Sequence, residues 1–161
     1  MELRGLPATQ RLAESVAAVL RPGDVLGLDG DLGAGKTTFV RFLARALGVT
    51  TPVTSPTFTL ANAYETSSSH LIIHHIDAYR LAGDADAEDL ALPELLDSGG
   101  IVVVEWAERL TLPPDRLDLH FQFPPAHSLE ADAGDHRIAT ISARGPGWRT
   151  RLVEIPAVLS G

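Results

Sequence analysis

The chain has 161 residues, of which 45% are hydrophobic and 21% are charged, and it contains no cysteine. This composition predicts a single globular domain over residues 1–161 and excludes wholesale disorder, a disulfide framework and a cysteine nucleophile. The formal net charge of −8 opposes non-specific binding to nucleic acid, which depends on clustered lysine and arginine. No signal-peptide pattern and no apolar run of membrane-spanning length is found, so we expect a cytoplasmic protein that does not engage a membrane.

The first half of the chain alternates between predicted helices and strands. Apolar residues at helical spacing predict a helix within residues 9–24, which "PG" brings to an end. A short apolar run at residues 25–29 is typical of a buried strand, and a glycine-rich turn follows it. Residues 36–47 return to helical spacing, and Gly48 is placed to end that second helix.

The middle of the chain contains a predicted hairpin. Residues 58–65 and 70–77 are strand-like runs on either side of the polar turn 66–69, which indicates two antiparallel strands. Residues 86–100 favour a helix. The segment "IVVVE" at residues 101–105 is the most strand-like in the sequence, and its unbroken apolar run predicts a strand that is buried on both faces.

The last third of the chain predicts two further strands. Residues 116–123 alternate strictly between apolar and polar side chains, which is typical of a half-exposed strand, and residues 136–143 are its expected antiparallel neighbour. Between them, residues 124–135 are polar and rich in turn formers, which predicts a loop. We find no internal repeat and no domain boundary, in agreement with a single domain.

One short segment carries a specific chemical signature. Gly30, Gly35, Lys36 and Thr37 match the phosphate-binding pattern G-x-x-x-x-G-K-[ST], and they lie between a predicted strand and a predicted helix, as that pattern requires. Glycines let backbone N–H groups surround phosphate oxygens, and the helix N-terminus favours negative charge. The alternative is a glycine-rich turn without a ligand, which the agreement of motif and context disfavours.

Lys36 is the only lysine in the chain, because the other twelve basic residues are arginines. A lysine carries a compact charge on a long flexible stem that can reach the β and γ phosphates from inside the loop, whereas a planar guanidinium is wider. The single exception to the use of arginine therefore supports a phosphate-binding role for this position.

A phosphate-binding loop works with magnesium, for which Thr37 offers a hydroxyl ligand. An acid at the carboxyl end of a neighbouring strand commonly completes the site, and both Asp77 and Glu105 directly follow apolar runs. The alternative for each is a solvated acid at a strand end. The adjacent His74 and His75 point to opposite faces of a predicted strand, which favours structural roles for them.

Four short segments follow one another along the chain: "GDLGAGKTTFVR" at residues 30–41, "SPTF" at 55–58, "HIDAYRL" at 75–81 and "EW" at 105–106. Through these segments the sequence resembles the bacterial TsaE (formerly YjeE) family of ATPases, and the ordered set is far more specific than the phosphate loop alone. An upstream "T-x-x-L-A" at residues 9–13 also fits.

The resemblance implies an α/β fold of the P-loop NTPase-like, three-layer type, with a mainly parallel central sheet and an antiparallel part. It implies ATP and Mg²⁺ as ligands and slow ATP hydrolysis. It further implies an accessory role in the threonylcarbamoyladenosine (t6A) modification of tRNA, together with TsaB and TsaD. Because the chain is acidic, we expect tRNA to be met only indirectly, through the partner complex.

The resemblance also assigns expected roles to individual residues. Catalytic roles are implied for Lys36, Thr57, Asp77 and Glu105, and metal binding for Thr37, Asp77 and Glu105. Nucleotide contacts are implied for Thr9, Asp31, Leu32, Gly33, Ala34, Gly35, Lys36, Thr37, Thr38 and Trp106. Two assignments have an open alternative: Trp106 as a core aromatic residue, and Arg80 as either a phosphate partner or a structural ion pair.

Three other functions share a phosphate-binding loop. A small-molecule kinase would need an acceptor pocket and an arginine-rich lid, and residues 84–99 contain no arginine. A GTPase switch commonly uses an N-K-x-D element, which a chain with its only lysine in the loop cannot contain. A binding module whose hydrolysis is incidental remains open on the sequence alone.

Overall fold

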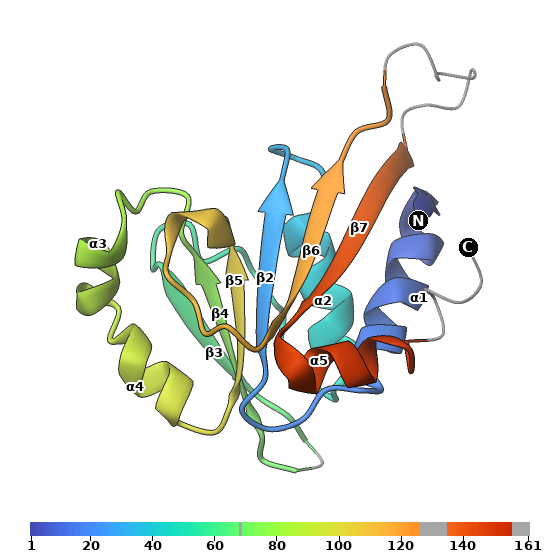
Figure 1. Ribbon diagram of the computed structural model, residues 1–161. Coiled ribbons are helices and arrows are strands. Elements are labelled where there is room, and N and C mark those ends of the chain that lie inside the picture. The colour runs from blue at the N-terminus through green and yellow to red at the C-terminus, as the bar shows by residue number, and fades with distance from the viewer. Residues whose placement is uncertain (68, 126–134, 156–161) are drawn as a thin grey trace.

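The computed structural model describes residues 1–67, 69–125 and 135–155, which form an α/β fold around a seven-stranded sheet. In the sheet the strands follow the order β1-β7-β6-β2-β5-β4-β3 (Figure 1). The strands are β1 (Glu2–Arg4), β2 (Val25–Gly30), β3 (Ala61–Glu65), β4 (Ile72–Asp77), β5 (Ile101–Glu105), β6 (Arg116–Gln122) and β7 (His136–Arg144).

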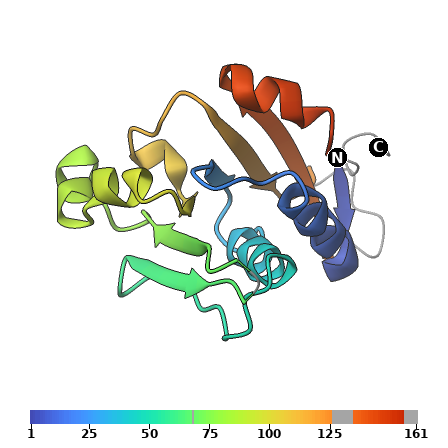
Figure 2. The same ribbon diagram turned by 90° about the horizontal axis from the view of Figure 1, so that it is seen from below.

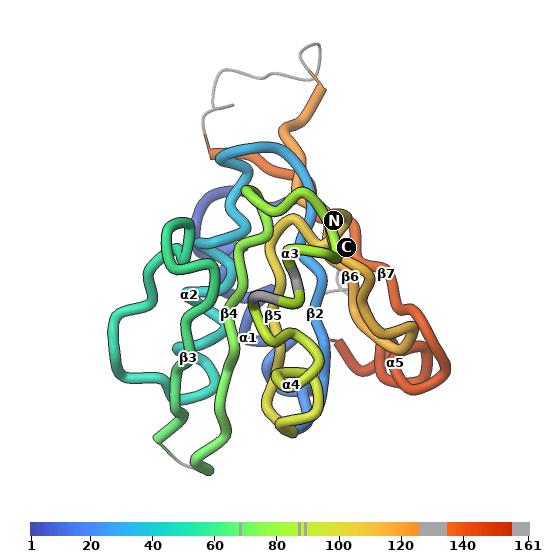
Figure 3. Tube along the Cα trace, turned by 90° about the vertical axis from the view of Figure 1, so that its left-hand side faces the viewer, coloured from blue at the N-terminus to red at the C-terminus, as the bar shows by residue number. Residues whose placement is uncertain are grey.

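The sheet has a parallel centre and antiparallel edges. Strand β2 pairs in parallel with both β5 and β6, and β5 pairs in parallel with β4. The hairpin β3–β4 forms one antiparallel edge, and β6, β7 and β1 form the other, so the strands lie side by side as Figure 3 shows. The predicted parallel centre with an antiparallel part is therefore confirmed. Because they run in parallel, β2, β4 and β5 have their carboxyl ends on the same side of the sheet, which is where open α/β sheets bind ligands.

Helices cover the sheet on both faces and complete three layers. Figure 2 shows α1 and α2 on one side and α3 and α4 on the other. A fifth helix, α5, packs beside β6 and β7. The helices are α1 (Gly5–Ala17), α2 (Lys36–Ala46), α3 (Asp84–Asp89), α4 (Leu92–Asp97) and α5 (Gly145–Leu152), with a 3₁₀ turn, η1 (Ala107–Arg109).

The predicted helices are confirmed with different boundaries. Helix α1 begins at Gly5, earlier than the periodic stretch suggested, and α2 ends near Gly48, whose φ of 88° is the left-handed conformation expected of a helix-ending glycine. The single helix expected at residues 86–100 is instead two short helices, because Ala91 between them has a left-handed φ of 50°.

The apolar core has one part on each face of the sheet. On the first face, Leu12 of α1 and Phe39 and Leu43 of α2 are fully buried against the central strands. On the second face, Leu92 of α4 packs in a cluster with Val104 of β5. Strand β5 contributes side chains to both parts and is buried at every position, as its unbroken apolar run predicted.

The predicted hairpin at residues 58–77 and the antiparallel pair at residues 116–143 are both confirmed. The loop expected at residues 124–135 lies largely outside the described residues. Among the described helices, none is long and apolar enough to cross a membrane.

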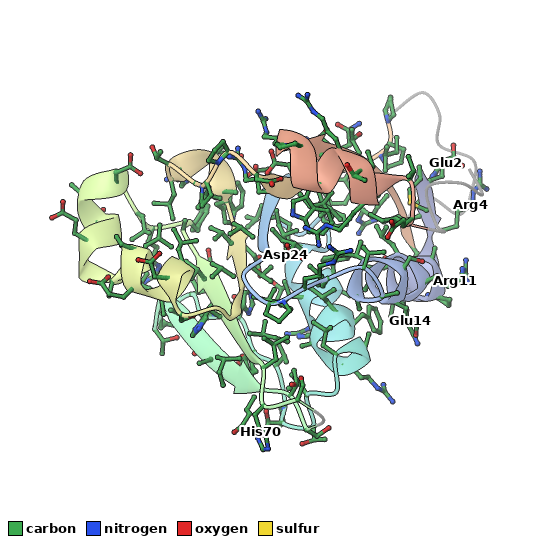
Figure 4. All side chains as sticks on the ribbon, turned by 60° about the horizontal axis from the view of Figure 1, so that its bottom comes forward. Glu2, Arg4, Arg11, Glu14, Asp24 and His70 are labelled. Carbon is green, nitrogen blue, oxygen red and sulfur yellow. The ribbon has the colours of Figure 1, made fainter. Side chains whose placement is uncertain are left out.

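A buried ion pair joins α5 to the segment before β2. The Arg151 guanidinium donates two hydrogen bonds of 2.7 Å to the two carboxylate oxygens of Asp24, and both side chains are about nine-tenths buried. Figure 4 shows Asp24 in the middle of the molecule, unlike the labelled surface side chains of Arg11 and His70.

We expect Arg151→Leu to lower the free energy of unfolding by about 3–5 kcal/mol, because the substitution leaves the Asp24 carboxylate buried without its partner. Urea unfolding followed by circular dichroism measures the loss. The matched control is Arg149→Leu on the same helix, since Arg149 is exposed and should tolerate the change within about 0.5 kcal/mol. Equal losses in the two variants would contradict the importance of the buried pair.

Candidate functional site

The glycine-rich loop lies between the carboxyl end of β2 and the N-terminus of α2 (Figure 1). Three of its glycines, Gly30, Gly33 and Gly35, have φ values of 116°, 75° and 108°, which L-residues with side chains rarely adopt. A Cβ atom at Gly30 would also lie 1.8 Å from the Phe121 carbonyl oxygen of β6, so only glycine fits there. The sequence pattern therefore corresponds to real backbone requirements.

Gly33 and Gly35 serve a different purpose from Gly30. Their positive φ values set the curvature of the loop, but a Cβ atom at either position would meet no described atom within 4 Å. The space beside these two glycines is therefore open, at the N-terminus of a helix whose first N–H groups lack intrahelical partners. This is the arrangement in which a backbone can approach an anion closely.

Lys36 is the first residue of α2, and its side chain is buried beneath the loop. Its ammonium donates hydrogen bonds to the carbonyl oxygens of Gly30 at 2.8 Å and Asp31 at 2.9 Å, and it lies 3.9 Å from the centre of the Trp106 ring. Burial lowers the pKa of the ammonium, while the nearby Glu105 carboxylate acts in the opposite direction. With three N–H donors and two of them used, the ammonium keeps one for a further acceptor.

Glu105 ends β5 and is almost completely buried. The Thr37 hydroxyl lies 2.9 Å from each of its carboxylate oxygens, and the imidazole Nε2 of His75 lies 2.7 Å from Oε1. The structure therefore brings Thr37 of the loop into contact with Glu105 at the end of β5. It also places His75 against Glu105, a contact that the sequence did not predict.

Asp77 ends the neighbouring strand β4 and is also buried. The Thr57 hydroxyl donates a hydrogen bond of 3.0 Å to its Oδ2, and the backbone N–H of Tyr79 donates one of 3.0 Å to its Oδ1. The hydroxyl groups of Ser55 and Thr57 are 2.7 Å apart. The segment "SPTF" is thus held against the second acid, as its predicted place near the site requires.

A cleft of about 290 Å³ opens beside the loop. It includes all the residues predicted to be catalytic or metal-binding: Lys36, Thr37, Thr57, Asp77 and Glu105. The other described residues that line it are Leu32, Gly33, Gly35, Thr38, Ser55, Tyr79 and Trp106.

Three residues predicted to contact the nucleotide do not line this cleft. Thr9 is buried in α1, Ala34 is buried within the loop, and the Asp31 carboxylate accepts a hydrogen bond from the backbone N–H of Phe123 on the far side of the loop. The backbone N–H groups of Asp31 and Ala34 are also already hydrogen bonded, to the carbonyl oxygens of Phe121 and Asp31. A contact by Thr9 stays a prediction without support from this geometry.

Trp106 follows Glu105 directly, and it is half-buried where the second core cluster meets the cleft. Its φ of 60° is left-handed, and its ring is half-buried beside Lys36 and 5.0 Å from the Tyr79 ring, measured between centroids. The two rings form one wall of the cleft, and Arg109 lies over both. The prediction that Trp106 lies near the ligand-binding region therefore agrees with its position.

Two exposed apolar side chains belong to the segments that form the site. Leu32, which lines the cleft, is 72% exposed, and Phe58, which does not, is 85% exposed. Arg80 stacks on Phe58 at 4.7 Å from the ring centre, and it makes no ion pair in the described structure. Of the two roles left open for Arg80, the structural ion pair is therefore not found.

A pair of acids lies at the edge of the site. The backbone N–H of Glu108 donates a hydrogen bond of 3.0 Å to the Asp29 carboxylate. A side-chain hydrogen bond with Asp29, together with burial, raises the pKa of Glu108 to about 7. Near neutral pH Glu108 is therefore only partly ionised, and it adds less negative charge beside Lys36 than an ordinary glutamate would.

The residues of the cleft fit a magnesium ion that is shared with a phosphate ligand. The hydroxyl of Thr37 and the carboxylates of Asp77 and Glu105 supply the oxygen atoms that Mg²⁺ prefers. No group of three or more His, Cys, Asp or Glu side chains among the described residues could hold a metal ion by itself. Magnesium here would therefore need phosphate oxygens and water as its remaining ligands, which is common for this ion.

No site role was predicted from the sequence for three residues that the structure places in or directly behind the cleft. Ser55 and Tyr79 line the cleft; they belong to the segments "SPTF" and "HIDAYRL", in which these two residues were assigned no role of their own. His75 contacts Glu105. The sequence does contain a signal for His75. Side chains alternate between the two faces of a strand, so His75, two residues before Asp77, lies on the same face of β4 as that acid. For Tyr79, which follows the strand in a turn, no periodicity applies.

The three-layer fold, with a glycine-rich loop between β2 and α2, defines the class as P-loop NTPase-like. The family model for the threonylcarbamoyl adenosine biosynthesis protein TsaE matches residues 3–129. The tRNA threonylcarbamoyladenosine biosynthesis protein TsaE of Streptomyces coelicolor is 39% identical over 151 residues, which cover 92% of this chain and 99% of that protein. Its namesake from Bacillus subtilis is 44% identical over 113 residues, 69% of each chain.

A solved structure has the same fold. The crystal structure of Bacillus subtilis YdiB matches with a TM-score of 0.75 and 32% sequence identity, and the match covers 97% of this chain and 92% of that one. The chain belongs to the TsaE family, which takes part in the biosynthesis of threonylcarbamoyladenosine in tRNA. The family indicated by the four sequence segments is confirmed.

Proposed function

We propose that the chain binds ATP with Mg²⁺ in the cleft and hydrolyses it slowly. The glycine-rich loop and Lys36 bind the phosphates, and Thr37 and Glu105 hold the metal ion, with Asp77 orienting metal or water. The observation that carries this proposal is the convergence of Thr37 and Glu105, which come from α2 and β5 and whose side chains are 2.9 Å apart at the open end of the loop.

The chemistry of each group supports its role. Backbone N–H groups and an ammonium neutralise phosphate charge without adding bulk, and they act most strongly on the charge that develops during transfer. A bound Mg²⁺ would supply further charge neutralisation at the phosphates. The buried position of Lys36, Asp77 and Glu105 excludes much of the water that would otherwise screen these interactions.

The proposed biological role is that of a cytoplasmic accessory ATPase for the t6A modification of tRNA, acting with TsaB and TsaD. Membership of the TsaE family supports the pathway, and the net charge of −8 favours protein partners over direct contact with tRNA. Slow turnover by the isolated chain is expected where the groups that complete a P-loop site are ordered only when a partner binds.

Co-purification tests this role. The tagged chain is incubated with a bacterial lysate with and without added Mg²⁺ and ATP, and retained proteins are identified by mass spectrometry. We expect TsaB and TsaD to be retained in an ATP-dependent manner by the wild type and by the surface variant Arg149→Ala, and to be lost with Lys36→Ala. Tight tRNA binding by the isolated chain, or rapid phosphorylation of a small metabolite without partners, would overturn the proposal.

A further inference from the structure

A fully buried histidine lies directly behind the cleft. The Nε2 atom of His75 is 2.7 Å from Oε1 of Glu105, and the exposed fractions of the two side chains are 0% and 4%. The carboxylate thus lies between two contacts, the Thr37 hydroxyl on the side of the loop and the imidazole on the side of β4. His75 itself does not line the cleft.

Strand geometry fixes which of two adjacent histidines makes this contact. In β4, His75 and Asp77 lie on one face and His74 on the other. The parallel register places Asp77 beside Glu105 of β5. His74 has its Nε2 3.1 Å from the Ser98 hydroxyl, away from the cleft.

The contact determines which atom of His75 donates. A carboxylate only accepts hydrogen bonds, so the imidazole Nε2 must carry the proton that is shared with Glu105. The other ring nitrogen, Nδ1, is buried without a hydrogen-bond partner among the described residues. Burying a polar atom unpaired is unfavourable, and an aliphatic side chain would fill the same space without this cost. The hydrogen bond to Glu105 is therefore what the histidine adds at this position.

We propose that His75 is a positioning residue for Glu105, and this inference rests on the proposed function. By donating from behind, His75 fixes the rotation of the carboxylate so that it stays against the Thr37 hydroxyl, at the proposed magnesium site. Without that donor the carboxylate keeps only the Thr37 contact, and the attraction of the Lys36 ammonium acts on it unopposed. Groups that orient a metal-binding side chain commonly affect activity by about 10- to 100-fold.

A set of three variants separates positioning from packing. His75→Leu removes the donor, His75→Gln keeps an N–H group near the Nε2 position, and His74→Leu changes the neighbouring histidine on the opposite face. ATP affinity is measured by calorimetry with Mg²⁺ and with EDTA, and steady-state hydrolysis gives kcat and KM. Thermal unfolding of each variant shows that it is folded.

For His75→Leu we expect kcat to fall by about 10- to 100-fold and the gain in ATP affinity from Mg²⁺ to be lost, while affinity in EDTA stays unchanged. His75→Gln should recover most of both quantities, and His74→Leu should behave as the wild type. An unchanged magnesium effect in His75→Leu, or equal defects in the leucine and glutamine variants, would overturn the inference while leaving ATP binding intact. A wild type that binds no ATP would instead remove the proposed function, and this role with it.

A second readout needs no nucleotide. Nitrogen-15 NMR of the imidazole in the free protein should show a His75 Nε2 proton that exchanges slowly with water, because it is buried and hydrogen bonded. Glu105→Ala should shift this signal or speed its exchange, whereas His74→Leu should not. An imidazole protonated at Nδ1 alone would contradict the inference even if all variants fold.

Discussion

Replacing Lys36 with alanine is expected to weaken ATP binding by about 10- to 150-fold, because hydrogen bonds to charged groups contribute roughly 1.5–3 kcal/mol. Lys36→Arg should fail nearly as badly, although it keeps the positive charge. The ammonium occupies a space bounded by two carbonyl oxygens and the face of Trp106, and a planar guanidinium is wider and prefers a forked geometry. Titration with a fluorescent ATP analogue measures both variants.

The matched control for this prediction is the reverse exchange in the same helix. Arg45 is exposed in the last turn of α2, so Arg45→Lys should leave ATP affinity unchanged. Wild-type affinity in Lys36→Arg would show that charge alone is required at this position. It would also remove the physical explanation of why Lys36 is the only lysine, when the other basic residues of the chain are all arginines.

The two strand-end acids should affect hydrolysis far more than binding. We expect Asp77→Asn and Glu105→Gln each to lower the hydrolysis rate by about 100-fold, within the range that positioned acids and bases contribute, whereas ATP affinity should fall less than the rate in Mg²⁺ and stay unchanged in EDTA. The physical reason is that their charges matter most when charge develops on the transferred phosphate. Steady-state rates and calorimetric affinities are measured on the same preparations.

Glu14→Gln serves as the control for the loss of one negative charge, since Glu14 is an exposed carboxylate on α1. If one of the two acid variants hydrolyses ATP normally, that acid has no role in hydrolysis, and the other acid alone acts with the metal ion. If both variants hydrolyse normally, the assigned chemistry of the cleft is wrong.

Elements with strong periodicity were predictable, and weakly patterned ones were not. Strand β1 has three residues, too few for a period, and it forms only by pairing with β7. Helix α5 contains two glycines and a proline, which disfavour a helix. It forms because Asp115 accepts hydrogen bonds from the N–H groups of Gly147 and Trp148, and because the Trp148 side chain is buried. Such tertiary contacts leave no local pattern in the sequence.

The candidate site was more predictable than its surroundings. The loop, Asp77 and Glu105 follow from short motifs at strand ends, since parallel strands bring their carboxyl ends together. The contact of His75 with Glu105 depends on strand register, which the sequence alone does not fix. The position of Thr9, which does not line the cleft, depends in the same way on the packing of α1 against α2, and its nucleotide contact stays a prediction.

The close approach of Gly30 to β6 limits how this protein can change during evolution. The backbone N–H of Asp31 donates a hydrogen bond of 3.0 Å to the Phe121 carbonyl, the same oxygen that a side chain at position 30 would strike. Any replacement of Gly30 therefore requires a simultaneous shift of a strand more than eighty residues away in the sequence. The first glycine of the loop is therefore constrained by its neighbouring strand as well as by any ligand, and a substitution there would disturb the fold itself.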